Sequence, residues 1–471
     1  SYTPSSYNGY GQGAEGRIIC NGSCSALFGA NGINGGYGYI EINVNEDNGK
    51  ASGVNSNNEG NGIGKDSRGE VVINMKGKNG SATGVGNNNG SLDGGIGTIT
   101  INDTGGNNIL GLNGGSNFKG SSINITSVAN NDKTIKGIFA DKGDVYNPHQ
   151  IIGENHGELN IKSTGSATIE GMTENYDVAI NGKRYDKIND GTISIIRDYT
   201  EDNAEGSPDK PTSVTYGMKY SNLTNKGIIK IEGPKTLGKN QYDYLYGMFN
   251  NYDNKVLLNY GTIDVSGGYK RYAMYNGSNI TTSFNYGTAI GDLYNVSNAA
   301  GGKLYGKIIG DGIKGLVNGD AEHIATSVTD QDKGYIEYTL SGDDTAVISG
   351  DSIYSNKTYN FTNYGVINAF NKVSDGIAYL ANDYSPKNYG YIKITNLIDG
   401  ATVSAIKNTQ PHSISNQGTL EVVANNTNNV KLYGIMKNPE NLDSTKNTGT
   451  IKIDMTGNNN TAYGIYSKSN V

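Results

Sequence analysis

The phrase NYGTIDV at residues 259–265 returns, with small changes, along most of this sequence. Close copies are NKGIIKI at residues 225–231, NYGVINA at 363–369, NYGYIKI at 388–394 and NTGTIKI at 447–453. Apolar residues occupy alternate positions after the glycine, which is typical of a strand with one buried face. One such strand cannot bury that face alone, so the repetition decides the fold.

The shared core of the phrase is Gly-x-apolar-x-apolar, and it returns about every 32 residues. A second phrase, Gly followed by an apolar residue and often preceded by Tyr, follows most copies, as at Gly217 and Gly434. With two weaker copies included, the fourteen copies of the first phrase begin at Gly38, Gly69, Gly97, Ser121, Gly157, Gly191, Gly227, Gly261, Gly287, Gly334, Gly365, Gly390, Gly418 and Gly449.

Copies that lie one above another bury their apolar residues against each other. We therefore predict an all-β fold, a single-stranded parallel β-helix of about 14 coils of roughly 23–47 residues, with the usual right-handed winding. We expect the asparagines of Asn-x-Gly to form an amide ladder at one corner. We expect the glycine there to adopt a positive φ. The 3.6-residue period of helical repeats and the four strands per blade of a propeller are both missing.

Residues 1–36 differ from the rest and are predicted to form an N-terminal cap or an irregular first coil, with the β-helix over residues 37–471. Both cysteines lie in this first segment. We predict a disulfide between Cys20 and Cys24, and two free thiols are the alternative.

Three stretches are longer or more polar than a plain coil, near residues 143–156, 197–213 and 291–334. In solenoids, insertions tend to lie on one face and to bind partners. A tolerated surface insertion is the alternative for each of them.

Composition excludes several classes of function. The net charge of −7 is spread along the chain, and no Lys/Arg block indicates nucleic acid. No apolar run is long enough for a transmembrane helix, so membrane insertion by this segment is not expected, and no signal-peptide pattern is present. The four histidines show no metal-ligand or triad spacing. We expect no cofactor, no metal and no enzymatic activity.

Tyrosines gather between residues 242 and 294, in a chain with 34 Tyr and no Trp. Tyrosine offers a flat face and a hydroxyl, which suit contacts with sugars or proteins. The alternative is that Tyr serves as the ordinary aromatic residue of stacked coils. The binding residues predicted here are Tyr242, Tyr244, Tyr269, Arg271, Tyr272 and Tyr294, with Asp198 and Tyr199 from the insertion at 197–213.

The NxGxIxI phrases and their partners TYGMKY (residues 215–220), LYGMFN (245–250) and AYGIYS (462–467) resemble the passenger region of type V autotransporter adhesins. They are most similar to the large fusobacterial outer-membrane adhesins. The likeness runs from about residue 36 to the end and rests on architectural motifs.

The resemblance implies a secreted passenger on the bacterial cell surface, anchored in the outer membrane by a C-terminal β-barrel that this sequence lacks. It implies a monomer with a role in virulence, bound to a host receptor protein, a host glycan or a partner bacterial surface protein. No binding motif of the family maps onto particular residues. A passive stalk is the first alternative, and a polysaccharide-active β-helix enzyme is the second.

Overall fold

The computed structural model describes residues 16–28, 37–56, 68–87, 96–114, 116–130, 132–140, 154–174, 187–198, 206–220, 222–235, 237, 241–252, 255–277, 283–310, 315–350, 361–381, 386–409, 413–437 and 445–467. The chain divides into two compact units: unit 1 is Ser1–Asn250 with Gly261–Arg271, and unit 2 is Asn251–Tyr260 with Tyr272–Val471. Within the described ranges both units consist of strands and turns, and no helix there is long and apolar enough to cross a bilayer.

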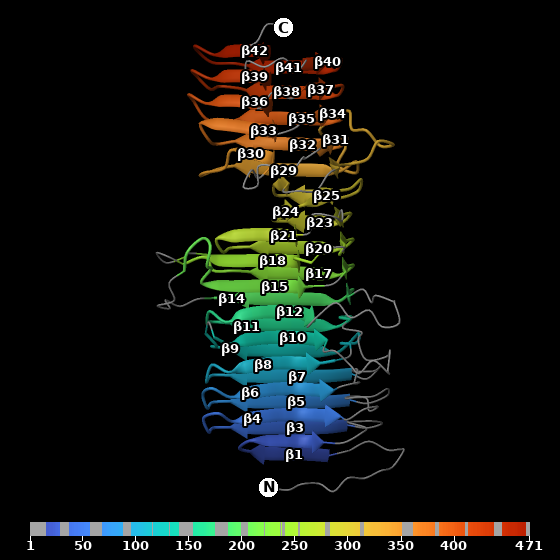
Figure 1. The fold of residues 1–471 in the computed structure, drawn as a ribbon, viewed down its shortest axis with the longest axis vertical. Coiled ribbons are helices and arrows are strands. Elements are labelled where there is room, and N and C mark those ends of the chain that lie inside the picture. Colours follow the sequence, from blue (N-terminus) through green and yellow to red (C-terminus); the bar gives the residue numbers. More distant parts are fainter. Residues whose placement is uncertain are drawn as a thin grey trace. The chain divides into compact units, whose positions relative to one another are not determined.

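In unit 1 the strands of successive coils lie one over another and pair in parallel (Figure 1). The first sheet contains β1 (Gly16–Asn21), β3 (Tyr37–Val44), β5 (Arg68–Met75), β7 (Ile96–Asp103), β9 (Ser122–Ser127), β11 (Glu158–Ser163), β14 (Thr192–Arg197), β17 (Ile228–Glu232) and β20 (Thr262–Ser266). The second contains β2 (Cys24–Phe28), β4 (Lys50–Ser56), β6 (Ser81–Asn87), β8 (Asn108–Asn113), β10 (Thr134–Ala140), β12 (Thr168–Glu174), β15 (Ser213–Lys219) and β18 (Asp243–Asn250). A short third sheet pairs β13 (Lys187–Asn189) with β16 (Leu223–Asn225).

Unit 2 repeats the three sheets. The first contains β23 (Thr288–Ile290), β26 (Lys303–Tyr305), β29 (Tyr335–Leu340), β32 (Val366–Asn371), β35 (Tyr391–Asn396), β38 (Thr419–Ala424) and β41 (Thr450–Met455). The second contains β24 (Asp292–Tyr294), β27 (Ile308–Gly310), β30 (Ala346–Gly350), β33 (Asp375–Ala381), β36 (Thr402–Asn408), β39 (Lys431–Lys437) and β42 (Thr461–Ser467), and residues from 272 onward in β21 (Lys270–Asn276) pair with β24. The third contains β19 (Leu257–Asn259), β22 (Ser283–Asn285), β25 (Val296–Asn298), β28 (Leu316–Asn318), β31 (Phe361–Asn363), β34 (Lys387–Asn388), β37 (Ile414–Asn416) and β40 (Thr445–Asn447).

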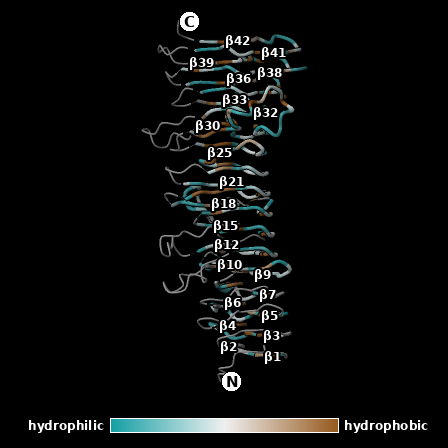
Figure 2. The backbone as a smooth tube through the Cα atoms, turned by 90° about the vertical axis from the view of Figure 1, so that its right-hand side faces the viewer, coloured by the Kyte–Doolittle hydropathy of each residue, from teal (hydrophilic) through white to brown (hydrophobic). Residues whose placement is uncertain are grey.

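Two aliphatic columns fill the inner face of the first sheet in unit 1. Figure 2 shows the matching alternation of apolar and polar residues along the strands. Each member is at most 2% exposed. One column is Ile40, Val71, Ile99, Ile123, Leu159, Ile193, Ile229 and Ile263, and the other is Ile42, Ile73, Ile101, Ile125, Ile161, Ile195, Ile231 and Val265. The predicted parallel β-helix is therefore confirmed, with like residues stacked on like.

The glycine of Asn-x-Gly has a different role from the one predicted. Gly191, Gly227 and Gly261 do not adopt a positive φ. A Cβ on Gly227 would instead overlap the carbonyl oxygen of Gly191, one coil earlier, and a Cβ on Gly261 would overlap that of Gly227. The expectation of a positive φ was wrong because these glycines are needed for close contact between the backbones of successive coils.

Some coils carry no recognisable phrase. β1 pairs with β3 in continuous register, so residues 16–21 form a regular rung within the segment predicted as a cap or irregular coil. β26 is a strand of the first sheet that lies inside the predicted insertion at 291–334. In the same insertion, β24 and β27 belong to the second sheet, and β25 and β28 belong to the third. Strands of three residues leave too short a pattern for sequence periodicity to detect, which also explains why the third sheet was missed.

Candidate functional site

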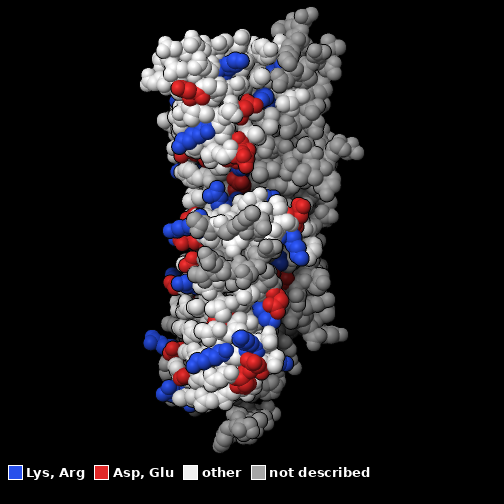
Figure 3. Space-filling model, turned by 90° about the vertical axis from the view of Figure 1, so that its left-hand side faces the viewer, with Lys and Arg blue, Asp and Glu red and all other residues white. Residues whose placement is uncertain are grey.

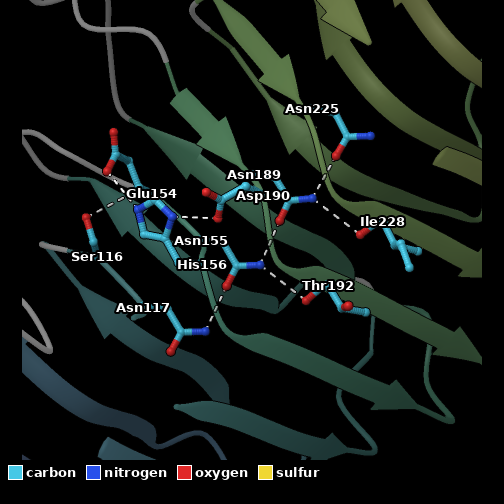
Figure 4. Close-up of polar contacts among 10 residues, drawn as sticks. All are labelled: Ser116, Asn117, Glu154, Asn155, His156, Asn189, Asp190, Thr192, Asn225 and Ile228. Carbon is cyan, nitrogen blue, oxygen red and sulfur yellow. Dashed lines mark hydrogen bonds and ion pairs between the residues drawn. The ribbon is translucent and has the colours of Figure 1, made fainter. Parts of the chain in front are cut away.

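A buried ladder of asparagine side chains marks the corner between the third and first sheets in both units. In unit 1 the Nδ2 of Asn117, Asn155 and Asn189 each donate to the Oδ1 of the next asparagine, ending at Asn225, at 2.7 Å (Figure 4). In unit 2 the ladder runs at 2.6–2.9 Å through Asn259, Asn285, Asn298, Asn318, Asn363, Asn388, Asn416 and Asn447. The predicted amide ladder is thus confirmed.

Ladder amides also donate hydrogen bonds to the backbone. The second N–H of Asn155 donates to Thr192 O at 3.2 Å, and that of Asn189 donates to Ile228 O at 3.3 Å. The carbonyl of Asn155 accepts the N–H groups of both Asp190 and Gly191 at 2.9 Å. Buried polar groups need such partners, so the ladder satisfies a corner that would otherwise bury unpaired donors and acceptors.

His156 lies beside this ladder and bridges two carboxylates from successive coils (Figure 4). Its Nε2 is 2.9 Å from Oε2 of Glu154, and its Nδ1 is 2.5 Å from Oδ1 of Asp190. Glu154 and His156 flank ladder residue Asn155, and Asp190 directly follows Asn189. The ring of Phe118, next to Asn117, is 6.0 Å from the imidazole ring. The position after each ladder asparagine thus carries Phe118, His156 and Asp190 in turn.

The two carboxylates define what His156 can do. Burial by itself would lower the pKa of His156, but hydrogen bonds to Glu154 and Asp190 and their negative charges raise it overall. Both ring nitrogens are engaged by acceptors, which favours the doubly protonated imidazolium. An imidazolium held in this way is a poor general base, because it has no free lone pair. This cluster could not be predicted from the sequence, because 34 residues separate His156 from Asp190.

A tyrosine cluster in unit 1 contains three of the predicted binding residues. The rings of Tyr242 and Tyr269 meet edge to face at 4.9 Å, and those of Tyr244 and Tyr269 lie nearly parallel at 6.1 Å. Lys270 places its Nζ 5.0 Å from the centre of the Tyr244 ring. Tyr269 is 47% exposed, whereas Tyr244 is buried. Of the three rings, Tyr269 is therefore the one best able to meet a partner.

A polar turn fixes this cluster. Ser207 and Lys210 exchange backbone hydrogen bonds, and the Tyr244 hydroxyl donates to the carbonyl of Pro208 between them. Burial, together with Asp209 and Tyr242 nearby, raises the pKa of the Tyr244 hydroxyl, which therefore stays protonated as a donor. Residues 206–210 belong to the predicted insertion at 197–213, so this part of it packs on the sheet.

The other predicted binding residues do not join that cluster in the described structure. Arg271 is exposed on β21, and Asp198 is exposed at the end of β14. Tyr272 and Tyr294 belong to unit 2, where both contact the ring of Tyr275, at 5.2 and 4.4 Å. Tyr199 lies outside the described residues.

Stacked tyrosines also occur as part of the ordinary coil. Tyr260 lies over Tyr286 at 5.0 Å, Tyr364 over Tyr389 at 5.2 Å and Tyr433 over Tyr463 at 5.2 Å. Some tyrosines are thus ordinary aromatic residues of the stacked coils, which was the alternative to a binding role in the sequence analysis. What distinguishes the Tyr242–Tyr244–Tyr269 cluster is its ordered turn and the cations on β21.

The first coil carries the disulfide. The structure joins Cys20 and Cys24 across the turn between β1 and β2. Among the described residues, no three His, Cys, Asp or Glu side chains come together in a way that would hold a metal ion. Figure 3 shows Lys and Arg interspersed with Asp and Glu on the face that it draws.

Comparisons with protein-family models, with curated proteins and with solved structures found no match to this chain. The choice of a function therefore rests on the side chains described above.

Proposed function

We propose that the chain is a segment of a bacterial cell-surface adhesin of the type V autotransporter class. In this proposal the β-helix is a rigid scaffold, displayed at the outer membrane, and exposed side chains bind a host receptor protein, a host glycan or a partner bacterium. The observation that carries the proposal is the cluster of Tyr242, Tyr244 and Tyr269, with Lys270 over the Tyr244 ring. The exposed Arg271 follows Lys270 on β21. Tyr and Arg are the residues that most often dominate binding energy.

The rigidity of the tyrosine cluster supports this proposal. Tyr244 is held by the Pro208 carbonyl and by Lys270, so little conformational freedom would be lost when a partner covers Tyr269. The disulfide suits an oxidising compartment, as expected for an exported protein. Both His156 nitrogens are engaged by carboxylates, so this histidine is poorly placed to act as a general base.

Binding of the purified chain to host cells, to immobilised glycans and to bacterial partner cells tests the proposal. We expect Tyr269→Ala and Arg271→Ala each to weaken binding roughly tenfold or more, as for residues at the centre of an interface. Tyr260→Ala is the matched control, because Tyr260 is also exposed, at 51%, and stacked on a neighbouring tyrosine. Equal binding by all variants would reject this site, and absence of binding by the wild-type chain would reject the adhesin role.

A passive stalk is the second candidate. The observation in its favour is the unit 2 ladder from Asn259 to Asn447, in which the same side-chain contact recurs on successive coils and is buried up to Asn416. Such a body would serve to hold another part of a protein at a distance. A chain that unfolds cooperatively and binds none of the three target classes would favour this candidate.

A further inference from the structure

The position after each ladder asparagine in unit 1 brings ionisable groups of opposite sign together. His156 and Asp190 hold this position on successive coils, because the backbone N–H of His156 donates to Asn117 O and that of Asp190 donates to Asn155 O. Lys226 occupies the same position on the coil after that of Asp190, and its backbone N–H donates to Asn189 O at 2.7 Å. Phe118 holds it on the coil before and adds no charge. Glu154 reaches His156 from its own coil.

We propose that Glu154, His156 and Asp190 form a proton-dependent clamp, which fixes the coil of β11 to the coil of β14 when His156 is protonated and loosens that junction when it is not. The charged imidazolium has two N–H donors, one for each carboxylate. The neutral ring has only one. The other carboxylate then faces a ring nitrogen lone pair, and this contact of two acceptors is repulsive.

The direction of the pH effect follows from the raised pKa of His156. A histidine whose pKa is higher in the folded than in the unfolded state stabilises the fold fully below the ordinary value of about 6.5. That stabilisation is lost as pH rises through the folded-state pKa.

The junction under the clamp is the ladder rung between Asn155 and Asn189. The amides of Asp190 and Gly191 both donate to Asn155 O across it, so their hydrogen exchange reports its opening. The side chain of His156 is 25% exposed and that of Asp190 45%, so solvent screens part of the interaction. We expect a local effect on this rung and not a change in the whole fold.

The test is hydrogen exchange of these two amides, on either side of neutral pH and corrected for intrinsic rates, together with an NMR titration of the histidine rings. The chain has four histidines, and His156→Gln assigns the signal. We expect the His156 ring to titrate above about 6.5, and opening to increase roughly two- to tenfold after deprotonation. In His156→Gln this pH dependence should vanish. A His156 pKa at or below its ordinary value, or a pH dependence that survives in His156→Gln, would overturn the proposal.

Two further variants keep the result specific. Asp190→Asn preserves size and removes one charge, so it should lower the His156 pKa while the other carboxylate still holds the ring. His323→Gln removes the pair that His323 makes with Asp320 in an exposed turn of unit 2, and it should leave exchange at Asp190 and Gly191 unchanged. An unchanged His156 pKa in Asp190→Asn would also reject the clamp.

Discussion

The two units fill the same inner position of the first sheet with different chemistry. The next inward position along each strand, after the two aliphatic columns, is occupied in unit 1 by Met75, Asp103, Ser127, Ser163 and Arg197 on successive strands. Unit 2 passes from Leu340 to Asn371, Asn396 and Ala424. Unit 1 therefore buries the ionisable side chains Asp103 and Arg197 where unit 2 buries neutral amides, as Asn371 donates to Asn396 at 2.8 Å.

The difference shows which residues a solenoid can repeat. Stacking places each side chain against a copy one coil away, so a repeatable residue must bind its own kind. Asparagine meets this condition with one donor and one acceptor, and isoleucine and tyrosine meet it by packing. A charge does not, because its copy repels it. Arg197 is therefore a single residue, whose donors reach Thr215 Oγ1 at 3.0 Å and Gly165 O at 2.9 Å, with Asp243 at 4.0 Å.

Arg197→Met gives the largest expected effect. The variant leaves the Asp243 carboxylate buried without its cation and leaves the carbonyls of Gly165 and Ala167 without this donor. We expect a loss of about 3–5 kcal/mol in the free energy of unfolding, measured in denaturant. Lys230→Met, in which an exposed lysine on neighbouring β17 is replaced, is the control and should cause no measurable change. Adding Asp243→Leu to Arg197→Met should recover stability, and failure to do so would contradict the role given to this pair.

The next effect concerns the buried ladder of unit 2. Asn363 accepts from Asn318 and donates to Asn388, both at 2.8 Å. Asn363→Ala leaves a buried donor and a buried acceptor unpaired, so we expect a loss of about 2–4 kcal/mol in the free energy of unfolding. The half-exposed ladder of Asn43, Asn74 and Asn102 in unit 1 supplies the control. Asn74→Ala should cost about 0.5 kcal/mol, because water replaces its partners. Equal losses would show that burial is not what gives the ladder its strength.

The charged interior of unit 1 should also make its stability depend on pH. Burial raises the pKa of Asp243 to about 6 from an ordinary value of 3.8, although Arg197 opposes the shift. A carboxyl with a raised pKa stabilises the fold below its unfolded-state pKa, and this is lost as pH rises through about 6. Relative to Asp243→Asn, the wild type should lose about 3 kcal/mol between roughly pH 3 and pH 7. A difference between the two proteins that stays constant across this range would contradict the assignment.

What the sequence could predict follows from the same contrast. The aliphatic columns and the asparagine ladder were visible because self-complementary stacking leaves the same residues at every step. The charges inside unit 1 were not, because Arg197 and Asp243 each occur once and lie 46 positions apart in the sequence. The His156 site was hidden for the same reason. Strands such as β16 were missed because three residues, the last an asparagine, do not fit ordinary strand composition.

The Tyr242–Tyr244–Tyr269 cluster lies between these cases. The sequence predicted it from the local density of tyrosine, and the structure brings those three rings together. The sequence did not predict the turn at Pro208, whose carbonyl binds the Tyr244 hydroxyl, because composition carries no information on which insertion packs on which coil.

The smallest expected effect tests how closely successive coils approach. Gly434 and Gly464 occupy the same place in the second phrase of unit 2. A Cβ on Gly434 would lie 2.6 Å from the carbonyl oxygen of Gly464 and 2.5 Å from Cγ2 of Ile451, whereas a Cβ on Gly464 would meet no atom within 4 Å. Gly434→Ala should therefore lower the free energy of unfolding by about 1–3 kcal/mol, as for an overpacked core. Gly464→Ala should be neutral within about 0.5 kcal/mol. If both variants lost stability equally, backbone conformation, and not close contact between coils, would explain why glycine is needed here. The argument that successive coils approach closely would then fail at this position.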